Sequence, residues 1–502
     1  MVRSLHGQIT PLPIERPGRR PKNHNKGIAM QLALAIGITI FFAVMVGISL
    51  LASKRIHTGE DYIVAGRHLS PLMTTATIMA TWYAAETILV TADWVRTDGI
   101  DVMVLEPIGI GICLVIAGRF FARRLWDTKM MTLADVFGQR FGPVAEKLQA
   151  FTSIAYIGWV AVQLIGLAGV FNVFFDMPIA TGILLITIVL TLYTLIGGMW
   201  SVAMTDIVQL GLLLVGIVLL TMRVLAELGG GPLSGLSILF DRLDAELLVF
   251  VPTESFDSLQ TWVGLIITGM FANAATQDLA QRMLSARSGA VAERSAVTAG
   301  FLYLIFGSFP VLLGLSGNLL LDDTVTIGVI PALAEMLFSP TLSVIFVLTL
   351  TAAVTSSVDS GLLAPASVIA RNVAGPILKE RVSLITLTRI CVVGIALISA
   401  TIALTGTRAS ELIQASYSLT LPSFVVLFAA LYHKDARRLP GVLTIGTGIA
   451  LWLYEIIGTI VAGDAGGEIL SPGFPAFLFV LCIVVYMGTD RIVRHFEGGR
   501  SN

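Results

Sequence analysis

Residues 342–371 read LSVIFVLTLTAAVTSSVDSGLLAPASVIAR, an apolar run with a polar centre. A membrane helix needs about 20 predominantly apolar residues, and this run exceeds that length. Polar side chains at bilayer depth are costly, so the hydroxyls and the carboxylate at its centre mark a binding site or a pathway by default. The run therefore predicts a membrane helix with a functional centre.

The rest of the chain has the same apolar character. Of its 502 residues, 55% are hydrophobic and 13% are charged, and the mean hydropathy is +0.86. Such an excess cannot be buried in one water-soluble core, so we predict an all-α integral membrane protein. The 32 Lys and Arg against 33 Asp and Glu exclude the basic footprint of a nucleic-acid binder, so no nucleic-acid partner is expected.

Hydropathy predicts about thirteen transmembrane helices, which implies a lipid bilayer as partner. The expected spans are residues 28–52, 72–96, 101–121, 148–175, 179–197, 202–226, 259–281, 297–319, 341–370, 383–405, 410–431, 440–461 and 474–489. They divide the chain into an N-terminal tail (1–27), a transmembrane domain (28–494) and a C-terminal tail (495–502). The N-terminal tail is basic and rich in proline, which predicts disorder. No small-residue cleavage site follows it, so a cleavable signal peptide is not expected.

Positive charge alternates from loop to loop, as the positive-inside rule requires. One set of alternate loops holds 22 Lys and Arg, whereas the opposite set holds Arg96, Arg223, Arg242 and Arg408. We therefore expect a plasma-membrane protein, or an inner-membrane protein in a bacterium, with the C-terminus in the cytoplasm and the N-terminus outside. The basic N-terminal tail would favour the opposite orientation, but the later loops carry more Lys and Arg than the tail does.

The centre of span 72–96 reads ATWYAAET over residues 80–87. Small residues beside aromatic ones and a carboxylate predict a helix that opens near the midplane, where freed backbone carbonyls can coordinate a cation. The alternative is a regular helix in which Glu86 faces a neighbouring helix.

The centre of residues 342–371 carries a stripe of oxygen atoms. Ala353, Ser356, Ser357 and Ser360 follow the i, i+3, i+4, i+7 spacing of one helical face, with Asp359 beside it. Such hard oxygen ligands suit a small hard cation such as sodium. A helix-packing face, with hydroxyls bonded back to the preceding turn, explains the serines equally well but leaves Asp359 unexplained.

Two further polar features border apolar spans. Gly197 and Gly198 separate two spans, and Asp206 lies in the first turns of the second, where it is either a ligand or a complement to the helix dipole. Asp278 and Arg282 lie four residues apart at the end of span 259–281, and we interpret them as a plain surface pair.

Taken in order, several stretches resemble the sodium:solute symporter family. They are residues 60–67 (EDYIVAGR), 132–135 (TLAD) with 140–142 (RFG), 197–202 (GGMWSV) with 205–209 (TDIVQ), 281–282 (QR), 352–360 and 370–372 (ARN). The block from Gly197 to Gln209 is the most specific. Residues 80–82, 281–285 and 356–360 look most like the choline transporter branch of that family.

The resemblance implies a LeuT-like transporter core of two inverted five-helix repeats, roughly residues 72–226 and 259–431. It also implies a shared sodium site, comprising the carbonyls of Ala80, Tyr83 and Ala353 and the hydroxyls of Ser356 and Ser357. A second sodium site, seen in some members, would involve Asp206, Asp359 and Ser360.

The resemblance also points to a substrate site. A quaternary ammonium ligand wants a box of aromatic faces, because cation–π attraction substitutes for its hydration. Trp82 and Trp159 match the aromatic positions of the choline branch, whereas Ile110 and Thr276 stand at the other two, so half of the box is expected. Glu86 offers a protonated amine a charged contact instead.

The leading hypothesis is a sodium-coupled secondary active symporter that imports a small organic solute, with an amine or a quaternary ammonium compound as candidates. Sodium would be a co-transported ligand, and its gradient would supply the driving force because the chain has no Walker-type loop or other nucleotide-handling motif. No other cofactor is expected. The sequence shows no pair of nucleophile and general base of the kind that indicates an enzyme, so we do not expect enzymatic activity. The alternative is a sensory or non-concentrating membrane module that binds solute with the same fold.

Overall fold

The computed structural model describes residues 24–325, 328–379, 381–406, 409–462, 470–471 and 473–498. Most of the predicted N-terminal tail, Arg408 and the end of the C-terminal tail lie outside the described residues. The described part is helical, apart from an isolated bridge between Leu69 and Ala286 and the connecting loops. The prediction of an all-α protein is confirmed.

Residues 24–229 form ten α-helices: α1 (His24–Ser53), α2 (Gly59–Val64), α3 (Pro71–Trp82), α4 (Thr91–Asp98), α5 (Ile108–Ile116), α6 (Arg123–Asp127), α7 (Leu133–Phe141), α8 (Pro143–Phe151), α9 (Ala155–Phe175) and α10 (Ile179–Gly229). Short π or 3-10 segments join several of them: η1 (Ala65–Arg67), η2 (Glu86–Val90), η3 (Ile100–Val104), η4 (Ala117–Ala122) and η5 (Thr152–Ile154).

The second part of the chain continues in the same way, with α11 (Pro232–Arg242), α12 (Phe256–Phe271), α13 (Gln277–Ser285), α14 (Gly289–Leu320), α15 (Val329–Leu337), α16 (Pro340–Val368), α17 (Gly375–Ile377), α18 (Leu384–Ala403), α19 (Ala409–Ser418), α20 (Leu421–Tyr432), α21 (Arg438–Ala462) and α22 (Phe474–Gly498). Its short segments are η6 (Ala245–Leu248), η7 (Ala272–Ala275) and η8 (Ile369–Ala374).

Ten helical stretches of the described residues are long and apolar enough to cross a membrane. Every one of the thirteen predicted spans falls on helix, but two of them, 72–96 and 259–281, are broken into pieces too short to count. Two others, 179–197 and 202–226, join in the 51 residues of α10. The exact count of thirteen therefore stays a prediction.

A kink at Gly198 divides α10. Its φ of 51° and ψ of −155° are accessible to glycine, and a Cβ there would lie 2.5 Å from the backbone oxygen of Tyr62. The kink therefore lets α2 approach α10 closely, which explains why the sequence places a Gly-Gly pair between two apolar segments.

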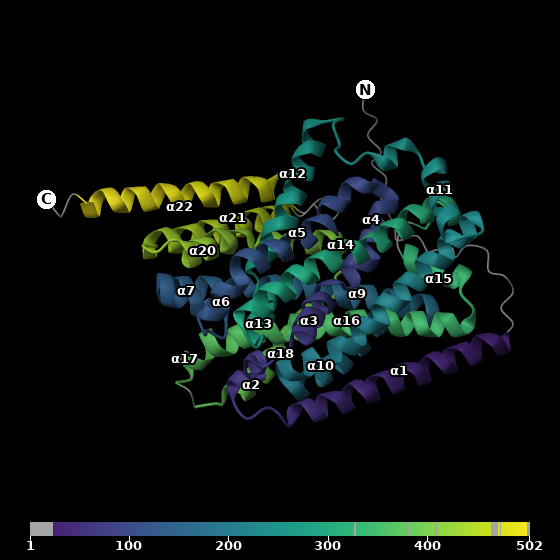
Figure 1. Cartoon of the computed structure of the whole chain (residues 1–502), viewed down its shortest axis with the longest axis horizontal. Helices are drawn as coiled ribbons and strands as arrows, with labels where there is room; N and C mark the ends of the chain where they lie inside the picture. The colour runs from purple at the N-terminus through teal and green to yellow at the C-terminus, as the bar shows by residue number, and fades with distance from the viewer. Residues whose placement is uncertain are drawn as a thin grey trace.

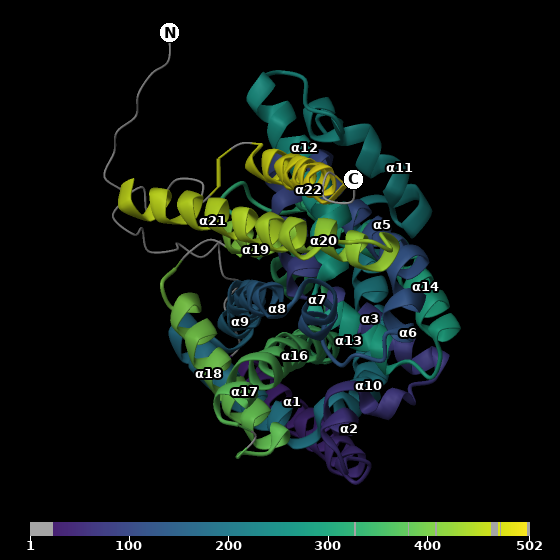
Figure 2. The same ribbon diagram turned by 90° about the vertical axis from the view of Figure 1, so that its left-hand side faces the viewer.

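The centre of the molecule is α16. Its residues 349–368 are all buried, and α3, α9, α10 and α18 pack around them. In contrast, α1 and α22 lie on opposite sides of the molecule, at the bottom and at the upper left of Figure 1, and Figure 2 also shows them far apart. Both carry exposed apolar side chains such as Ile40 and Val484, as lipid-facing helices do.

The two broken helices run in opposite directions. The start of α3 lies beside the end of α13, where the Leu69 amide donates to the Ser285 carbonyl at 3.0 Å and the Arg287 amide donates to the Leu69 carbonyl at 3.0 Å. An inverted repeat requires this antiparallel relation. The limits of the two repeats stay predictions.

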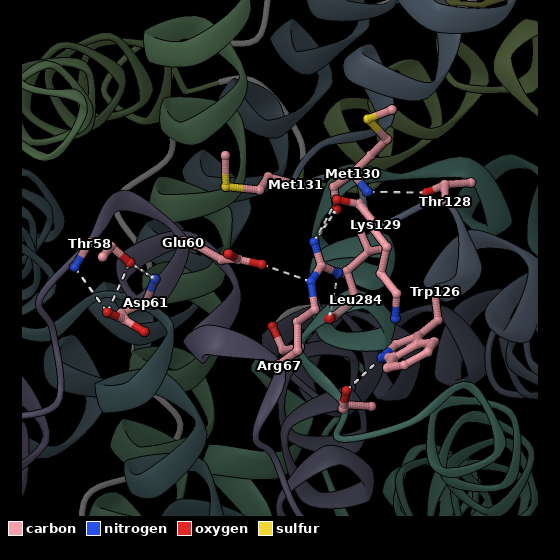
Figure 3. Close-up of polar contacts among 12 residues, drawn as sticks. Thr58, Glu60, Asp61, Arg67, Trp126, Thr128, Lys129, Met130, Met131 and Leu284 are labelled. Atoms are coloured by element: carbon pink, nitrogen blue, oxygen red, sulfur yellow. Dashed lines mark hydrogen bonds and ion pairs between the residues drawn. The ribbon is translucent and has the colours of Figure 1, made fainter.

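Arg67 fastens the same end of the molecule, as Figure 3 shows. Its guanidinium donates to the backbone oxygens of Leu284 at 3.2 Å, Lys129 at 2.9 Å and Met130 at 2.9 Å, and it pairs with Glu60 at 2.8 Å. We call these contacts the Arg67 clasp. The clasp joins η1 to the end of α13 and to the loop between α6 and α7.

Candidate functional site

The helix predicted over residues 72–96 opens where the sequence indicated. The α3 segment ends at Trp82, Tyr83 adopts φ −85° and ψ 75°, and helix resumes at Glu86 as η2. A regular helix through this region, the alternative interpretation, is wrong. The opening frees backbone carbonyls at the end of α3 from helical hydrogen bonds. These carbonyls lie beside the buried part of α16.

Three of the expected sodium ligands meet at this opening. The Ser357 hydroxyl donates to the Thr81 carbonyl at 2.9 Å, lies 3.2 Å from the Ala353 carbonyl and lies 3.5 Å from the Ala80 carbonyl. We call this group of oxygens the Ser357 cluster. Its hard neutral oxygens are of the type that replaces the hydration shell of a small cation.

Ser356 and Tyr83 lie differently from Ser357. The Ser356 hydroxyl donates to Asp206 Oδ1 at 2.5 Å, and the Thr77 hydroxyl donates to the other oxygen of that carboxylate. The Tyr83 hydroxyl donates to the Phe306 carbonyl at 2.7 Å, and no hydrogen bond of the described residues links the Tyr83 carbonyl to the two serines. The structure therefore connects Asp206, through Ser356, to the residues predicted for the shared sodium site.

Among the described residues, no hydrogen bond joins the three residues expected for a second sodium site to one another. Asp359 Oδ1 accepts from the Thr194 hydroxyl at 2.6 Å, whereas Ser360 donates to the Ser356 carbonyl at 2.9 Å and also contacts Arg282. Asp359 Oδ2 is buried and has no hydrogen-bond partner among the described residues. A buried carboxylate oxygen without a partner is costly, and a bound cation or a proton would satisfy it.

A cavity lies beside the opening. Its lining comprises Trp82, Glu86, Ala155, Tyr156, Trp159, Asn273, Thr276, Asp278, Ser416, Tyr417 and Thr420. The structure thus brings together the three residues predicted to bind substrate, namely Trp82, Glu86 and Trp159.

Four aromatic side chains face this cavity, twice as many as the sequence indicated. Tyr156 and Tyr417 line it together with the two tryptophans, whereas Ile110 is buried elsewhere in the core. Tyr156 lies three residues before Trp159 on α9, a helical spacing that could have identified it. Tyr417 carried no comparable signal.

Glu86 is fixed in the cavity wall, 2% exposed. The Trp159 indole nitrogen donates to its Oε1 at 2.8 Å, and the Gln163 amide donates to its Oε2. Gln163 in turn accepts from the Ala85 amide at 3.0 Å, inside the helix opening. The carboxylate is therefore held by neutral donors.

Asp278 and Arg282 correct the sequence analysis. They are 4% and 1% exposed, so the prediction of a plain surface pair is wrong. The Trp82 indole nitrogen donates to Asp278 Oδ2 at 2.8 Å, and the Tyr156 hydroxyl donates to Oδ1. Arg282 donates to the backbone oxygen of Asp278 at 2.9 Å. The break at η7 is the reason, because it makes α13 a separate helix that begins in the protein interior.

Comparisons with known proteins bear on the family and the fold of the chain. The model of the family described as "Sodium:solute symporter family" matches residues 62–438. The high-affinity choline transporter 1 of Drosophila melanogaster is 26% identical over 405 residues, which are 75% of this chain and 63% of that protein. The chain therefore spans less than two thirds of that relative. The sodium/proline symporter of Escherichia coli (strain K12) is 24% identical over 481 residues, covering 88% of this chain and 94% of that protein.

Among solved structures, the substrate-bound outward-open state of a Na+-coupled sialic acid symporter has the same fold. The TM-score is 0.75 at 17% sequence identity, and the match covers 92% of this chain and 97% of that one. At this identity the likeness establishes the inverted-repeat transporter fold, which confirms the predicted fold class.

Proposed function

The chain belongs to the sodium:solute symporter family, and from this premise we propose that it is a sodium-coupled secondary active symporter that imports a small organic ammonium compound. The observation that supports this most strongly is the junction of the Ser357 cluster with the aromatic cavity. Trp82 lines the cavity, and the adjacent Thr81 carbonyl belongs to the cluster. The membrane would be the plasma membrane, or the inner membrane of a bacterium, with the C-terminus in the cytoplasm.

The first sodium ion would bind the carbonyls of Ala80, Tyr83 and Ala353 and the hydroxyls of Ser356 and Ser357. The contacts of Ser357 with two of these carbonyls support the proposal. Binding there would require Ser357 to exchange its hydrogen bonds for the ion, which its position among three carbonyl oxygens allows.

A second sodium ion would use Asp206, Asp359 and Ser360. The unpartnered Oδ2 of Asp359 supports this proposal, since a carboxylate oxygen at this depth needs a positive partner. The contacts of Asp206 with Ser356 offer a physical link between the two ion sites.

Coupling would follow from the shared helix opening. An ion at the Ser357 cluster fixes the end of α3, and therefore the position of Trp82 and Glu86 in the cavity wall. Each ligand would then strengthen binding of the other, as linkage requires. Alternating exposure of the cavity to the two sides would carry both inward.

The solute class follows from the cavity. Aromatic faces attract a positively charged or quaternary nitrogen, and the Glu86 carboxylate complements that charge. The similarity to high-affinity choline transporters supports an ammonium compound as the solute.

A thermal-shift screen of the purified protein tests this proposal. Choline, simple amines, amino acids, monocarboxylates and sugars are compared in sodium and in potassium. We expect an ammonium compound to raise the melting temperature in sodium alone. Stabilisation that is the same in both salts would contradict sodium coupling, and failure to concentrate the ligand in proteoliposomes with a sodium gradient would favour a sensory or non-concentrating module.

A further inference from the structure

We propose that the solute is a diammonium compound, with two positively charged nitrogens rather than one. This inference rests on the proposed function and deepens it. Asp278 is buried, although its spacing from Arg282 is typical of a surface pair. Asp278 and Glu86 line the same cavity although they come from the two oppositely directed broken helices.

The two carboxylates are held in matching ways. Trp159 donates its indole N–H to Glu86 at 2.8 Å, and Trp82 donates its indole N–H to Asp278 at 2.8 Å. Both indoles line the cavity, and Tyr156 and Tyr417 add further aromatic surface. The cavity therefore offers two carboxylates, each with an adjacent aromatic wall, which is the environment that attracts an organic cation.

Nothing positively charged in the described structure contacts these carboxylates within ion-pair distance. Their recorded donors are neutral: an indole and an amide on Glu86, and an indole and a phenol on Asp278. Arg282 donates to the backbone oxygen of Asp278, to the Thr77 carbonyl and to the Ser360 hydroxyl instead.

Arg282 interacts electrostatically with Asp278, but it interacts in the same way with Asp206 and Asp359, so one cation is shared among several buried carboxylates. Two buried carboxylates that no cationic side chain contacts directly therefore favour a ligand that brings two positive charges, because an uncompensated buried charge is strongly destabilising. The oxygens of the proposed sodium sites are different atoms on α3, α10 and α16, so sodium bound there leaves Glu86 and Asp278 unpaired. A single ammonium group would pair with one carboxylate and leave the other.

Asn273 provides an independent sign of a missing partner. Its side-chain nitrogen is buried in the cavity wall, and the residue is 5% exposed, yet the nitrogen has no hydrogen-bond partner among the described residues. Rotation of the amide presents either its nitrogen or its oxygen to the cavity. A polar ligand held between the two carboxylates would provide the Asn273 side chain with its missing hydrogen-bond partner.

Matched amines test the inference on the unmodified full chain. Binding in sodium is measured for butylamine against 1,4-diaminobutane, and for pentylamine against 1,5-diaminopentane, by calorimetry and thermal shift. We expect at least one diamine to bind about tenfold or more tighter than the monoamine of equal length, as a close charge pair at an interface commonly provides.

Two isosteric variants test whether the carboxylates of Asp278 and Glu86 cause the preference for diamines. Asp278→Asn and Glu86→Gln each remove one charge while keeping an acceptor for the indole, and each should bring the diamine-to-monoamine affinity ratio close to one. A wild-type protein that binds monoamines or choline as tightly as diamines would overturn the inference and leave the proposed function intact. Sodium-dependent binding of none of the ammonium compounds would instead overturn the proposed function, and the comparison of wild-type affinities does not depend on how well the variants fold.

Discussion

The two broken helices resemble each other at the cavity and differ on the side away from it. In each, helix resumes with a carboxylate in its first turn, Glu86 at the start of η2 and Asp278 at the second residue of α13. A carboxylate is stabilised there by the partial positive charge of a helix start. Both carboxylates line the cavity, so both breaks contribute alike to the solute site.

The freed carbonyls distinguish the two breaks. At the first, the Ser357 hydroxyl lies within 3.5 Å of three carbonyl oxygens and close to Asp206 through Ser356. At the second, the Thr420 hydroxyl lies 2.7 Å from two carbonyls, those of Ala272 and Tyr417, and the Thr276 hydroxyl donates to the Asn273 carbonyl at 2.8 Å. A helix break thus becomes a candidate ion site only where several oxygens from another helix converge on it.

The largest expected effect is on the sodium requirement, and it tests the difference between the two breaks. Ser357→Ala removes the hydroxyl from the three converging carbonyls and should raise the sodium concentration for half-maximal stabilisation about tenfold, the loss of roughly one ligand contact. Thr420→Val, the matched change at the second break, should leave that concentration within about twofold. Sodium titrations of the melting temperature measure both, and equal effects at the two breaks would refute the contrast.

Glu86→Gln tests whether solute binding and sodium binding depend on different residues of the first break. The variant should weaken binding of an ammonium ligand about tenfold, because one buried charge contact is lost. Sodium titration without solute should stay close to wild type, since Glu86 is hydrogen-bonded to Trp159 and Gln163 rather than to the Ser357 cluster. Calorimetry in sodium checks this, and a neutral or anionic solute as the true ligand would remove this role of Glu86.

Asp206→Asn tests whether the first break serves one ion or two. The substitution should change the ratio of sodium to solute from about two to about one, because it removes a carboxylate proposed to hold the second ion. Reversal potentials in proteoliposomes give the ratio directly. A ratio equal to that of the wild-type protein would eliminate the second site.

The smallest expected effect concerns a region away from both breaks. Arg67→Ala removes the Arg67 clasp and should lower the melting temperature by a few degrees, since a nearly buried guanidinium loses several hydrogen bonds. Sodium and solute affinities should change little, as the clasp touches neither the cavity nor the Ser357 cluster. A large rise in the sodium requirement would show that the ends of α3 and α13 control the site directly.

Sequence reasoning predicted most of the first break and little of the second. Residues 80–87 combine small, aromatic and acidic side chains, so the opening could be anticipated, and the approach of Ser357 was implied by the resemblance to the sodium:solute symporter family. Residues 272–276 read ANAAT, without glycine or proline, so nothing local predicted the break that turns Asp278 inward. An aspartate four residues before an arginine is typical of a surface pair, and only tertiary packing distinguishes it from a cavity wall.

The aromatic residues of the cavity wall also differ in whether the sequence predicted them. Trp82 and Trp159 could be identified from the family resemblance, whereas Tyr417 reaches the cavity through the packing of α19 against α9, η2 and η7. Helix tilt and rotation set such contacts, and hydropathy carries no information about either. The orientation of Ser356 toward Asp206 is likewise a consequence of how α10 packs on α16.

The Arg67 clasp also constrains how the protein is made. Arg67 and its acceptor on Leu284 are 217 residues apart, so at about 5–20 residues per second the ribosome needs roughly 10 to 40 s to supply the second after the first. During that interval the start of α3 is already synthesised while the helix end that fastens it does not yet exist. The N-terminal half can meanwhile form only the contacts of Arg67 with Glu60, Lys129 and Met130, so the protein passes through a stage at which the contact with the second half of the chain is still missing.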